Sequence, residues 1–395
     1  MMGDRKRILH VITGLAMGGA EIMLYKLLQL HRDQFDCQVI SLTGEGPVAT
    51  KIQALGIPVR TLEMSRSFPG PFAVSRLAKW MRAAQPDLIQ TWMYHADLVG
   101  GLAAWLAGGL PLVWGIHNTT LDANLTKTRT RLVVTMNARL SHWLPEQIIS
   151  CSEKARELHI RKGYDRNKFT VIPNGFDLRD FKSDPDARVW LRSSLQLPPK
   201  TQMIGHVARF DPQKDYPNLL AAAAILRKTE PNVHFVLCGD GLSQDNDVLM
   251  DWVRSHQLQD RVHLLGRRED IARVMAAFDV GTLTSAYGEA FPNVVGEMMA
   301  CEVPCVVTDV GDSDLMVGDT GKVVPPRTPT ALAGAWAEFL HMPEPQRHEY
   351  GQAARDRIRK HFAIEEIAHR YANVYRSLLD QGTGTDESTE KEGQA

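Results

Sequence analysis

Short runs of apolar residues alternate along the chain with longer segments in which apolar residues recur every three or four positions. The first run, Arg7–Thr13, is typical of a buried parallel strand, and a helical pattern follows it. The alternation continues to Ile172, is interrupted, and starts again at Met203. Strands alternating with helices predict an α/β protein with parallel sheets, here two Rossmann-like βαβ arrays in tandem.

The interruption predicts how the chain divides. Residues 182–200 are largely polar and contain three prolines, so we interpret them as a linker or boundary. The last residues are rich in Gly, Thr, Glu and Lys without an apolar anchor, which predicts disorder. The predicted parts are two Rossmann-like domains, a C-terminal helix that packs back toward the first domain, and a disordered tail: 1–181, 182–365, 366–381 and 382–395.

Composition narrows the class of protein. The formal net charge is -1, so the overall charge does not predict a nucleic-acid partner. Five scattered cysteines without metal-site spacing fit reduced thiols, and hence a cytoplasmic protein. No secretory signal is predicted, and the longest uncharged stretch, 98–116, is interrupted by glycines and Pro111, which argues against a membrane span.

The segment from Glu289 to Glu297 is the strongest candidate for chemistry. Glu289 is predicted in a loop, Pro292 at the first turn of the next helix, and Glu297 on that helix. Backbone N–H groups at a helix N-terminus suit a diphosphate. Glu297 could then accept two ribose hydroxyls, and Glu289 could reach the hydroxyls of a sugar. The alternative is an ordinary solvated helix start with glutamate nearby.

Two cations form the second candidate. Arg209 and Lys214 lie in the loop after the predicted strand 203–208. Ligands of open α/β sheets bind at the carboxyl ends of strands, where Arg would supply a bidentate fork and Lys a point charge for a nucleotide diphosphate. The alternative is a pair of exposed surface cations.

The first domain offers weaker signals. Gly18 and Gly19 follow the first strand, and glycines let backbone amides approach a phosphate closely. The Gly-x-Gly-x-x-Gly spacing of dinucleotide-binding proteins is absent, which disfavours a nicotinamide oxidoreductase. His117 ends a predicted strand and could bind a sugar hydroxyl, as could His95. Tight turns and structural histidines are the alternatives.

Two further patterns bear on partners. Asp312 and Asp314 have a spacing that can hold a divalent metal, but they lie in a glycine-flanked loop of the second domain, so no metal is expected. Basic residues stand beside apolar ones in predicted helices over 72–84 and 121–144. Such helices could contact an anionic membrane surface, or they could be ordinary amphipathic helices packed on a core.

In the order and spacing of its motifs, the chain over about 1–375 resembles the retaining family-4 glycosyltransferases of the GT-B fold. In that fold two Rossmann-like domains face each other across a cleft that holds the active site. The resemblance rests on five features. In the first domain they are the glycine-rich opening, Met17–Glu21, and a strand end with Pro-Asn-Gly, Ile172–Asp177. In the second they are the loop with Arg209 and Lys214, a strand end with Gly-Asp-Gly, Cys238–Gly241, and the pair of Glu289 and Glu297.

The resemblance implies a role for each candidate. The first domain would take the acceptor and the second the donor, with Arg209 and Lys214 on the donor phosphates and Glu297 on the ribose. Glu289 would contact the transferred sugar. Backbone near Arg267 would meet the base, and His117 would lie by the transferred sugar. The remaining positions that the family uses for the donor are Gly18, Gly19, Ala290, Phe291, Pro292, Asn293 and Val294. Many relatives carry Gly where this chain has Ala290, which restricts that loop.

The implied activity is transfer of a hexosyl group from a nucleotide diphosphate sugar, with a UDP-sugar favoured, to a glycan or lipid-linked acceptor. The nucleotide sugar is a substrate, and neither a cofactor nor a metal is expected. A place in polysaccharide or glycoconjugate synthesis is implied, in the cytoplasm or on the cytoplasmic face of a membrane. A nucleotide-sugar epimerase and an inactive nucleotide-sugar binding protein are the alternatives.

Overall fold

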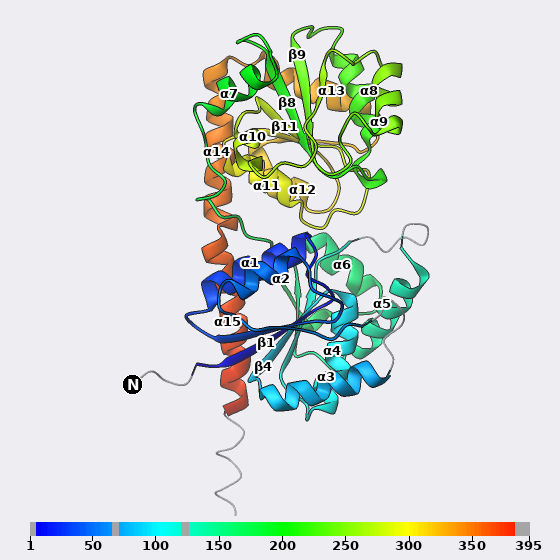
Figure 1. The fold of residues 1–395 in the computed structure, drawn as a ribbon, viewed down its shortest axis with the longest axis vertical. Helices are drawn as coiled ribbons and strands as arrows, with labels where there is room; N and C mark the ends of the chain where they lie inside the picture. The colour runs from blue at the N-terminus through cyan, green and yellow to red at the C-terminus, as the bar shows by residue number, and fades with distance from the viewer. Residues whose placement is uncertain (1–4, 65–70, 120–125, 384–395) are drawn as a thin grey trace, which may run out of the picture. The chain divides into compact units, whose positions relative to one another are not determined.

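The computed structural model describes residues 5–64, 71–119 and 126–383, which form two compact α/β units (Figure 1). The first unit contains the described residues up to Gly175 and those from Ile364 onward, and the second is Phe176–Ala363. The C-terminal helix, α15, spans Ile364–Thr383 and is longer than predicted. The rest of the predicted tail, and the start of the helix predicted over 121–144, lie outside the described residues.

The first unit is built on a seven-stranded parallel sheet of order β3-β2-β1-β4-β5-β6-β7. Its central strands are mostly buried because helices cover both faces, whereas the edge strands β3 and β7 are only partly buried. The strands β1 to β7 span Arg7–Ile12, Asp36–Ser41, Val59–Thr61, Leu88–Trp92, Leu112–Ile116, Gln147–Ser150 and Phe169–Val171. The helices α1 to α6 span Gly19–His31, Pro47–Gln53, Pro71–Ala84, Tyr94–Leu106, Thr128–Leu140 and Glu153–Arg161. One core lies under α1, α2 and α15, and the other under α3, α4 and α5.

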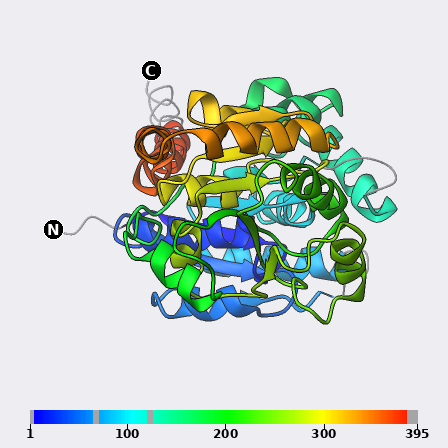
Figure 2. The same ribbon diagram turned by 90° about the horizontal axis from the view of Figure 1, so that it is seen from above.

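The second unit has a six-stranded parallel sheet of order β10-β9-β8-β11-β12-β13. Helices α8, α9 and α13 cover one face, and α10, α11, α12 and α14 lie on the other (labelled in Figure 1 and seen from above in Figure 2). The strands β8 to β13 span Gln202–Val207, Val233–Cys238, Val262–Leu264, Val280–Leu283, Cys305–Thr308 and Lys322–Val324. The helices α7 to α14 span Ala187–Ser194, Tyr216–Leu226, Asp247–Ser255, Ile271–Ala276, Asn293–Ala300, Ser313–Val317, Pro329–His341 and Glu344–Phe362. These two sheets confirm the α/β class with two Rossmann-like arrays.

The chain leaves the first unit at Gly175 and returns to it at Ile364, whereas the sequence placed the divisions at 181/182 and 365/366. Gly175 belongs to the first unit because it packs on Ile364, so closely that an added Cβ would lie 2.6 Å from its Cδ1. Phe176 belongs to the second, where its ring fills the space left by Gly296. Neither contact has a signal in the local sequence, because each joins residues far apart in the chain.

The segment interpreted as a linker contains a helix, α7, and that interpretation was wrong. Two of its basic residues, Arg188 and Arg192, lie 3.8 and 3.3 Å from the carboxylate of Asp279, which is 1% exposed. Arg347 from α14 reaches the same carboxylate at 3.4 Å. The segment looks polar in the sequence because its arginines pair with a buried acid inside the second unit.

Each sheet reverses its strand order once. The chain runs outward from β1 to β3 and returns beside β1 with β4, and it does the same from β8 to β11 in the second unit. Ligands of open α/β sheets bind outside the carboxyl ends of the strands at such a reversal. A ligand site is therefore expected at the loops after β1 and β4 in the first unit and after β8 and β11 in the second.

Candidate active site

The loops after β8 and β11 carry the residues that the sequence selected in the second unit. Arg209 and Lys214 follow β8, and Glu289 follows β11. The two strands pair in parallel through Ile204 and Val280, so their carboxyl ends lie side by side. Candidates separated by more than 70 positions in the chain thus meet at the reversal of the second sheet.

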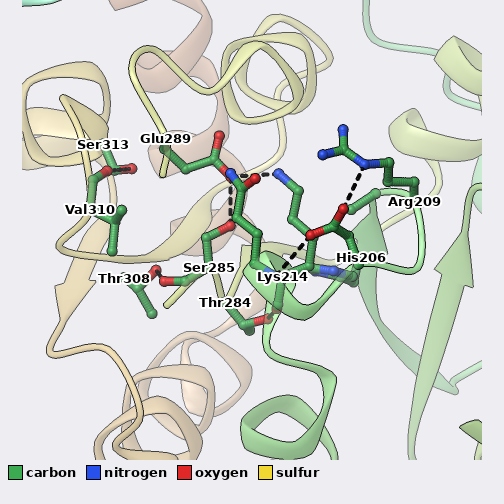
Figure 3. Close-up of polar contacts among 12 residues, drawn as sticks. His206, Arg209, Lys214, Thr284, Ser285, Glu289, Thr308, Val310 and Ser313 are labelled. Atoms are coloured by element: carbon green, nitrogen blue, oxygen red, sulfur yellow. Dashed lines mark hydrogen bonds and ion pairs between the residues drawn. The ribbon is translucent and has the colours of Figure 1, made fainter. Parts of the chain in front are cut away.

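Glu289 is the centre of this cluster (Figure 3). Its Oε1 lies 2.5 Å from Nζ of Lys214 and accepts hydrogen bonds from Oγ of Ser285 at 2.6 Å and Nε2 of Gln213 at 3.1 Å. The side chains of Glu289 and Lys214 are each only 11% exposed. The carboxylate and the ammonium are therefore held in fixed positions next to each other, with little water to screen them.

The loop that carries the two cations is held by Asp211. Its carboxylate accepts hydrogen bonds from the backbone N–H of Gln213 at 3.0 Å and from Nε of Arg209 at 3.1 Å. Burial alone would raise the pKa of Asp211, but these hydrogen bonds and the charges of Arg209 and Lys214 leave it lowered. The side chain of Arg209 remains 61% exposed, so its guanidinium is accessible from solvent.

Hydrogen bonds hold the backbone of Lys214 as well as its ammonium group. Its carbonyl accepts a hydrogen bond of 2.6 Å from Oγ1 of Thr284. The next residue, Asp215, has a positive φ of 53° and caps α8 by accepting from the N–H of Asn218. His206 is buried on β8. Burial, and to a smaller extent the charge of Lys214, lowers the pKa of His206 to about 3, so its ring is neutral.

The segment 290–294 forms the start of α11. Pro292 is the N-cap, and Asn293 and Val294 form the first turn, with Glu297 one turn further along. Ala290 is buried and has no positive φ, so alanine imposes no backbone strain there. The carbonyl of Ala290 accepts from the N–H of Asp312 at 2.9 Å, which ties this loop to the one after β12. The helix start therefore continues directly from the loop of Glu289, and that loop is bonded to the loop after β12.

In the first unit, Gly18 is the N-cap of α1 and Gly19 its first residue, after β1. A Cβ on Gly18 would lie 2.4 Å from Oε2 of Glu21, so the Glu21 side chain packs against the backbone at this glycine. Burial raises the pKa of Glu21.

His117 lies directly after β5 of the same unit. Neither ring nitrogen has a hydrogen-bond partner among the described residues, although both are shielded from solvent. Burial lowers its pKa to about 4, so the imidazole is neutral at pH 7 and offers one donor and one acceptor.

Some predicted site residues lie apart from the cluster around Glu289, and two residues of that cluster were not predicted. Arg267 is exposed after β10, two strands away from β8. Gly18, Gly19 and His117 belong to the other unit. Gln213 and Ser285 were not selected, because an amide or hydroxyl in a loop is too common to stand out. Across the described part of the chain, no group of three His, Cys, Asp or Glu side chains is placed to hold a metal ion.

Two protein-family models match the chain. The one described as Glycosyltransferase Family 4 matches residues 17–180, and the one described as Glycosyl transferases group 1 matches residues 191–357. Each match covers most of one Rossmann-like array. The second contains the whole cluster around Glu289 and the helix α11.

Individual relatives agree with this. EpsF of Bacillus subtilis (strain 168) is 30% identical over 332 residues, covering 78% of this chain and 80% of EpsF. UDP-Gal:alpha-D-GlcNAc-diphosphoundecaprenol alpha-1,3-galactosyltransferase of Escherichia coli is 27% identical over 320 residues, covering 79% and 81%. The crystal structure of Anabaena Alr3699/HepE in complex with UDP is similar with a TM-score of 0.83 and 26% identity, covering 94% of this chain and 100% of HepE. The chain therefore belongs to glycosyltransferase family 4, has the GT-B fold and is a glycosyltransferase.

Proposed function

We propose that this glycosyltransferase moves a hexosyl group from a UDP-sugar to a glycan or lipid-linked acceptor with retention at the anomeric carbon and without a metal ion. One observation carries the proposal. At the reversal of the second sheet, Lys214 in the loop after β8 forms an ion pair with Glu289 in the loop that leads into α11. A cation and a helix start fit a departing diphosphate, and an acid beside them fits the sugar hydroxyls.

The relatives support the donor and acceptor classes. The E. coli relative uses UDP-Gal and a diphosphoundecaprenol acceptor, and HepE was solved with UDP. We infer the same donor base for this chain and an acceptor of the same kind, within polysaccharide or glycoconjugate synthesis.

In the proposed reaction, the bond between the anomeric carbon and the β-phosphate oxygen breaks, and UDP leaves with the electron pair. The acceptor hydroxyl bonds to the same carbon on the same face and passes its proton to the departing phosphate oxygen. Lys214, Arg209 and the N–H groups of α11 stabilise the charge that develops on the phosphates. Because the three are positioned before the reaction, they can replace the charge of a metal ion.

The remaining site residues bind the donor and orient the transferred sugar. Glu289 holds a hydroxyl of the transferred sugar, and Glu297 accepts from the ribose hydroxyls. Backbone near Arg267 meets the base. In the first unit, His117 hydrogen-bonds the sugar, and the backbone at Gly18 and Gly19 accommodates phosphate or acceptor. Ser285 and Gln213 position Glu289 by holding its Oε1.

A donor screen followed by product analysis tests the function. We expect a UDP-sugar to raise Tm above the value with other nucleotide sugars, because a ligand that binds only the folded state stabilises it. With that donor and a diphosphate-lipid acceptor, NMR of the product should show the donor's anomeric configuration, and EDTA should leave the rate unchanged. Inversion, or a loss of activity that magnesium restores, would contradict the mechanism. Conversion of the donor without acceptor would favour the epimerase.

The outer surface of α3, α4 and α5 supports a membrane as a further partner. Helices α3 and α5 each carry three Lys or Arg and no Asp or Glu. Half of the exposed large apolar side chains in the described residues belong to this layer or to the turn after it: Phe72, Trp105, Leu106, Leu132 and Trp143. Exposed aromatic residues among unopposed cations fit an anionic bilayer. No helix in the described ranges is long and apolar enough to cross one.

Vesicle co-sedimentation tests this contact. Arg76→Gln with Lys79→Gln should weaken binding to phosphatidylglycerol vesicles about 30-fold, since each basic residue near the surface contributes about 1 kcal/mol. The matched control changes two exposed lysines of the second unit, Lys200→Gln with Lys228→Gln, and removes the same charge. Equal binding by the two double variants, or binding that salt does not weaken, would contradict a docking face on this layer.

A further inference from the structure

Three aromatic rings connect the C-terminal helix to the candidate site of the first unit. The indole of Trp92, the last residue of β4, stacks with the imidazole of His117 at a centroid distance of 5.1 Å and an angle of 17°. The same indole stacks with the ring of Tyr371, on α15, at 6.0 Å and 13°. Trp92 and Tyr371 are buried, at 0% and 1% exposed. The three rings are thus nearly parallel, and the two beside His117 are fully enclosed.

Trp92 is held independently of His117. Its indole N–H donates to Nδ1 of His10 on β1 at 3.3 Å, and its carbonyl accepts from the hydroxyl of Thr13 at 3.5 Å. Burial lowers the pKa of His10 to about 3, so this ring is neutral and its Nδ1 can accept. The plane of the indole is therefore fixed by β1 at the point where the first sheet reverses.

His117 has no comparable support of its own. Because its ring nitrogens have no hydrogen-bond partner within the described residues, no protein hydrogen bond there sets the plane of the imidazole. The parallel contact with Trp92 is the interaction that can do so, since offset stacking restricts the tilt of a ring. Neither nitrogen is then committed to a hydrogen bond with another of the described residues.

We propose that Trp92 and Tyr371 are positioning residues that fix the imidazole of His117, so that helix α15 is part of the framework of the active site. The proposal rests on the function proposed above, in which His117 contacts the transferred sugar. Trp92 and Tyr371 do not themselves touch the substrate. They set the direction in which His117 presents its donor and its acceptor.

A double-mutant cycle tests this inference. His117→Ala removes the imidazole and Trp92→Leu misplaces it, and each should lower kcat for transfer about tenfold, since a misplacement of about 1 Å can cost up to about 10²-fold. The double variant should lose no more than His117→Ala alone, since Trp92 acts through His117. Tyr371→Leu should give a smaller loss of the same kind, with the donor KM within about twofold, as expected when an interaction specific to the transition state is lost.

Two controls separate positioning from stability. Trp114 is equally buried in the neighbouring strand but packs in the other core, and Tyr164 is a buried tyrosine of that same core. Trp114→Leu and Tyr164→Leu should lower Tm but leave kcat within about twofold. NMR adds a readout without substrate. Trp92→Leu should shift the imidazole C–H signals of His117 and raise its pKa toward the ordinary value, because its ring becomes more exposed.

The outcomes are distinct. If His117→Ala has no effect, its role in the proposed function is wrong, whatever the Trp92 variants do. If His117→Ala lowers kcat but the loss from Trp92→Leu is absent or adds fully to it, the positioning by Trp92 is wrong. If the His117 signals and pKa are unchanged in Trp92→Leu, the stack does not hold the ring. Equal losses in the Trp114 control would assign the effect to stability.

Discussion

Replacing Lys214 by alanine is expected to lower kcat for sugar transfer by about 10³-fold, in line with the loss of one charged group that stabilises a transition state. The Lys214 side chain is 11% exposed and its ammonium lies 2.5 Å from Oε1 of Glu289, so its charge acts where water screens little. The substitution also removes the cation beside Oε1 of Glu289, which still accepts hydrogen bonds from Ser285 and Gln213. Steady-state kinetics with a saturating donor would measure the loss.

Two variants make the result specific to Lys214. Lys228→Ala removes an exposed lysine from the same unit and should leave kcat within about twofold, as surface substitutions do. Lys214→Arg keeps the charge but replaces a compact ammonium by a larger planar fork, so it should restore only part of the rate. A Lys214→Ala enzyme with the same Tm and a kcat near that of the parent would exclude the ion pair from the reaction.

The location of this site could be predicted because it depends on a rule of chain direction. Once the apolar runs before Arg209 and before Glu289 are recognised as parallel strands, both loops must emerge at the same edge of a sheet. The sequence cannot show that the two strands are neighbours. That follows from the order β8-β11, which is set by contacts between distant segments.

The supporting residues could not be predicted for a different reason. Gln213 and Ser285 become part of the site only through distances to Glu289, and nothing in their local sequence differs from that of other loops. The stack of Tyr371 on Trp92 is a similar case, since it forms only because α15 packs on the first sheet. Periodicity gives the strands and helices, whereas packing decides which side chains meet.

The linker prediction over residues 182–200 was wrong because the charges of its arginines are neutralised by an acid inside the second unit. Arg188 and Arg192 looked like linker residues because arginine is seldom buried. Asp279 follows an apolar helix and gives no sign that three arginines will surround it. Only the folded chain shows that their charges balance.

Replacing Gly311 by alanine is expected to destabilise the second unit by about 3 kcal/mol, combining a left-handed backbone with a steric clash. Its φ is 58°, and an added Cβ would lie 2.2 Å from the carbonyl oxygen of Glu289 and 2.8 Å from that of Ala290. Both obstacles are backbone atoms, which cannot swing aside as a flexible side chain would. The loop that carries Glu289 must therefore move, and activity should fall together with Tm.

The matched control is Gly334→Ala on α13. An added Cβ there meets nothing within 4 Å, and the position is helical, so alanine should stabilise the protein by about 0.5–1 kcal/mol. Thermal unfolding and transfer assays on the two variants separate loop displacement from a general glycine effect. If Gly311→Ala kept the parent's Tm and kcat, the loop after β12 would not constrain Glu289. The position of that carboxylate would then depend on its contacts with Lys214, Ser285 and Gln213.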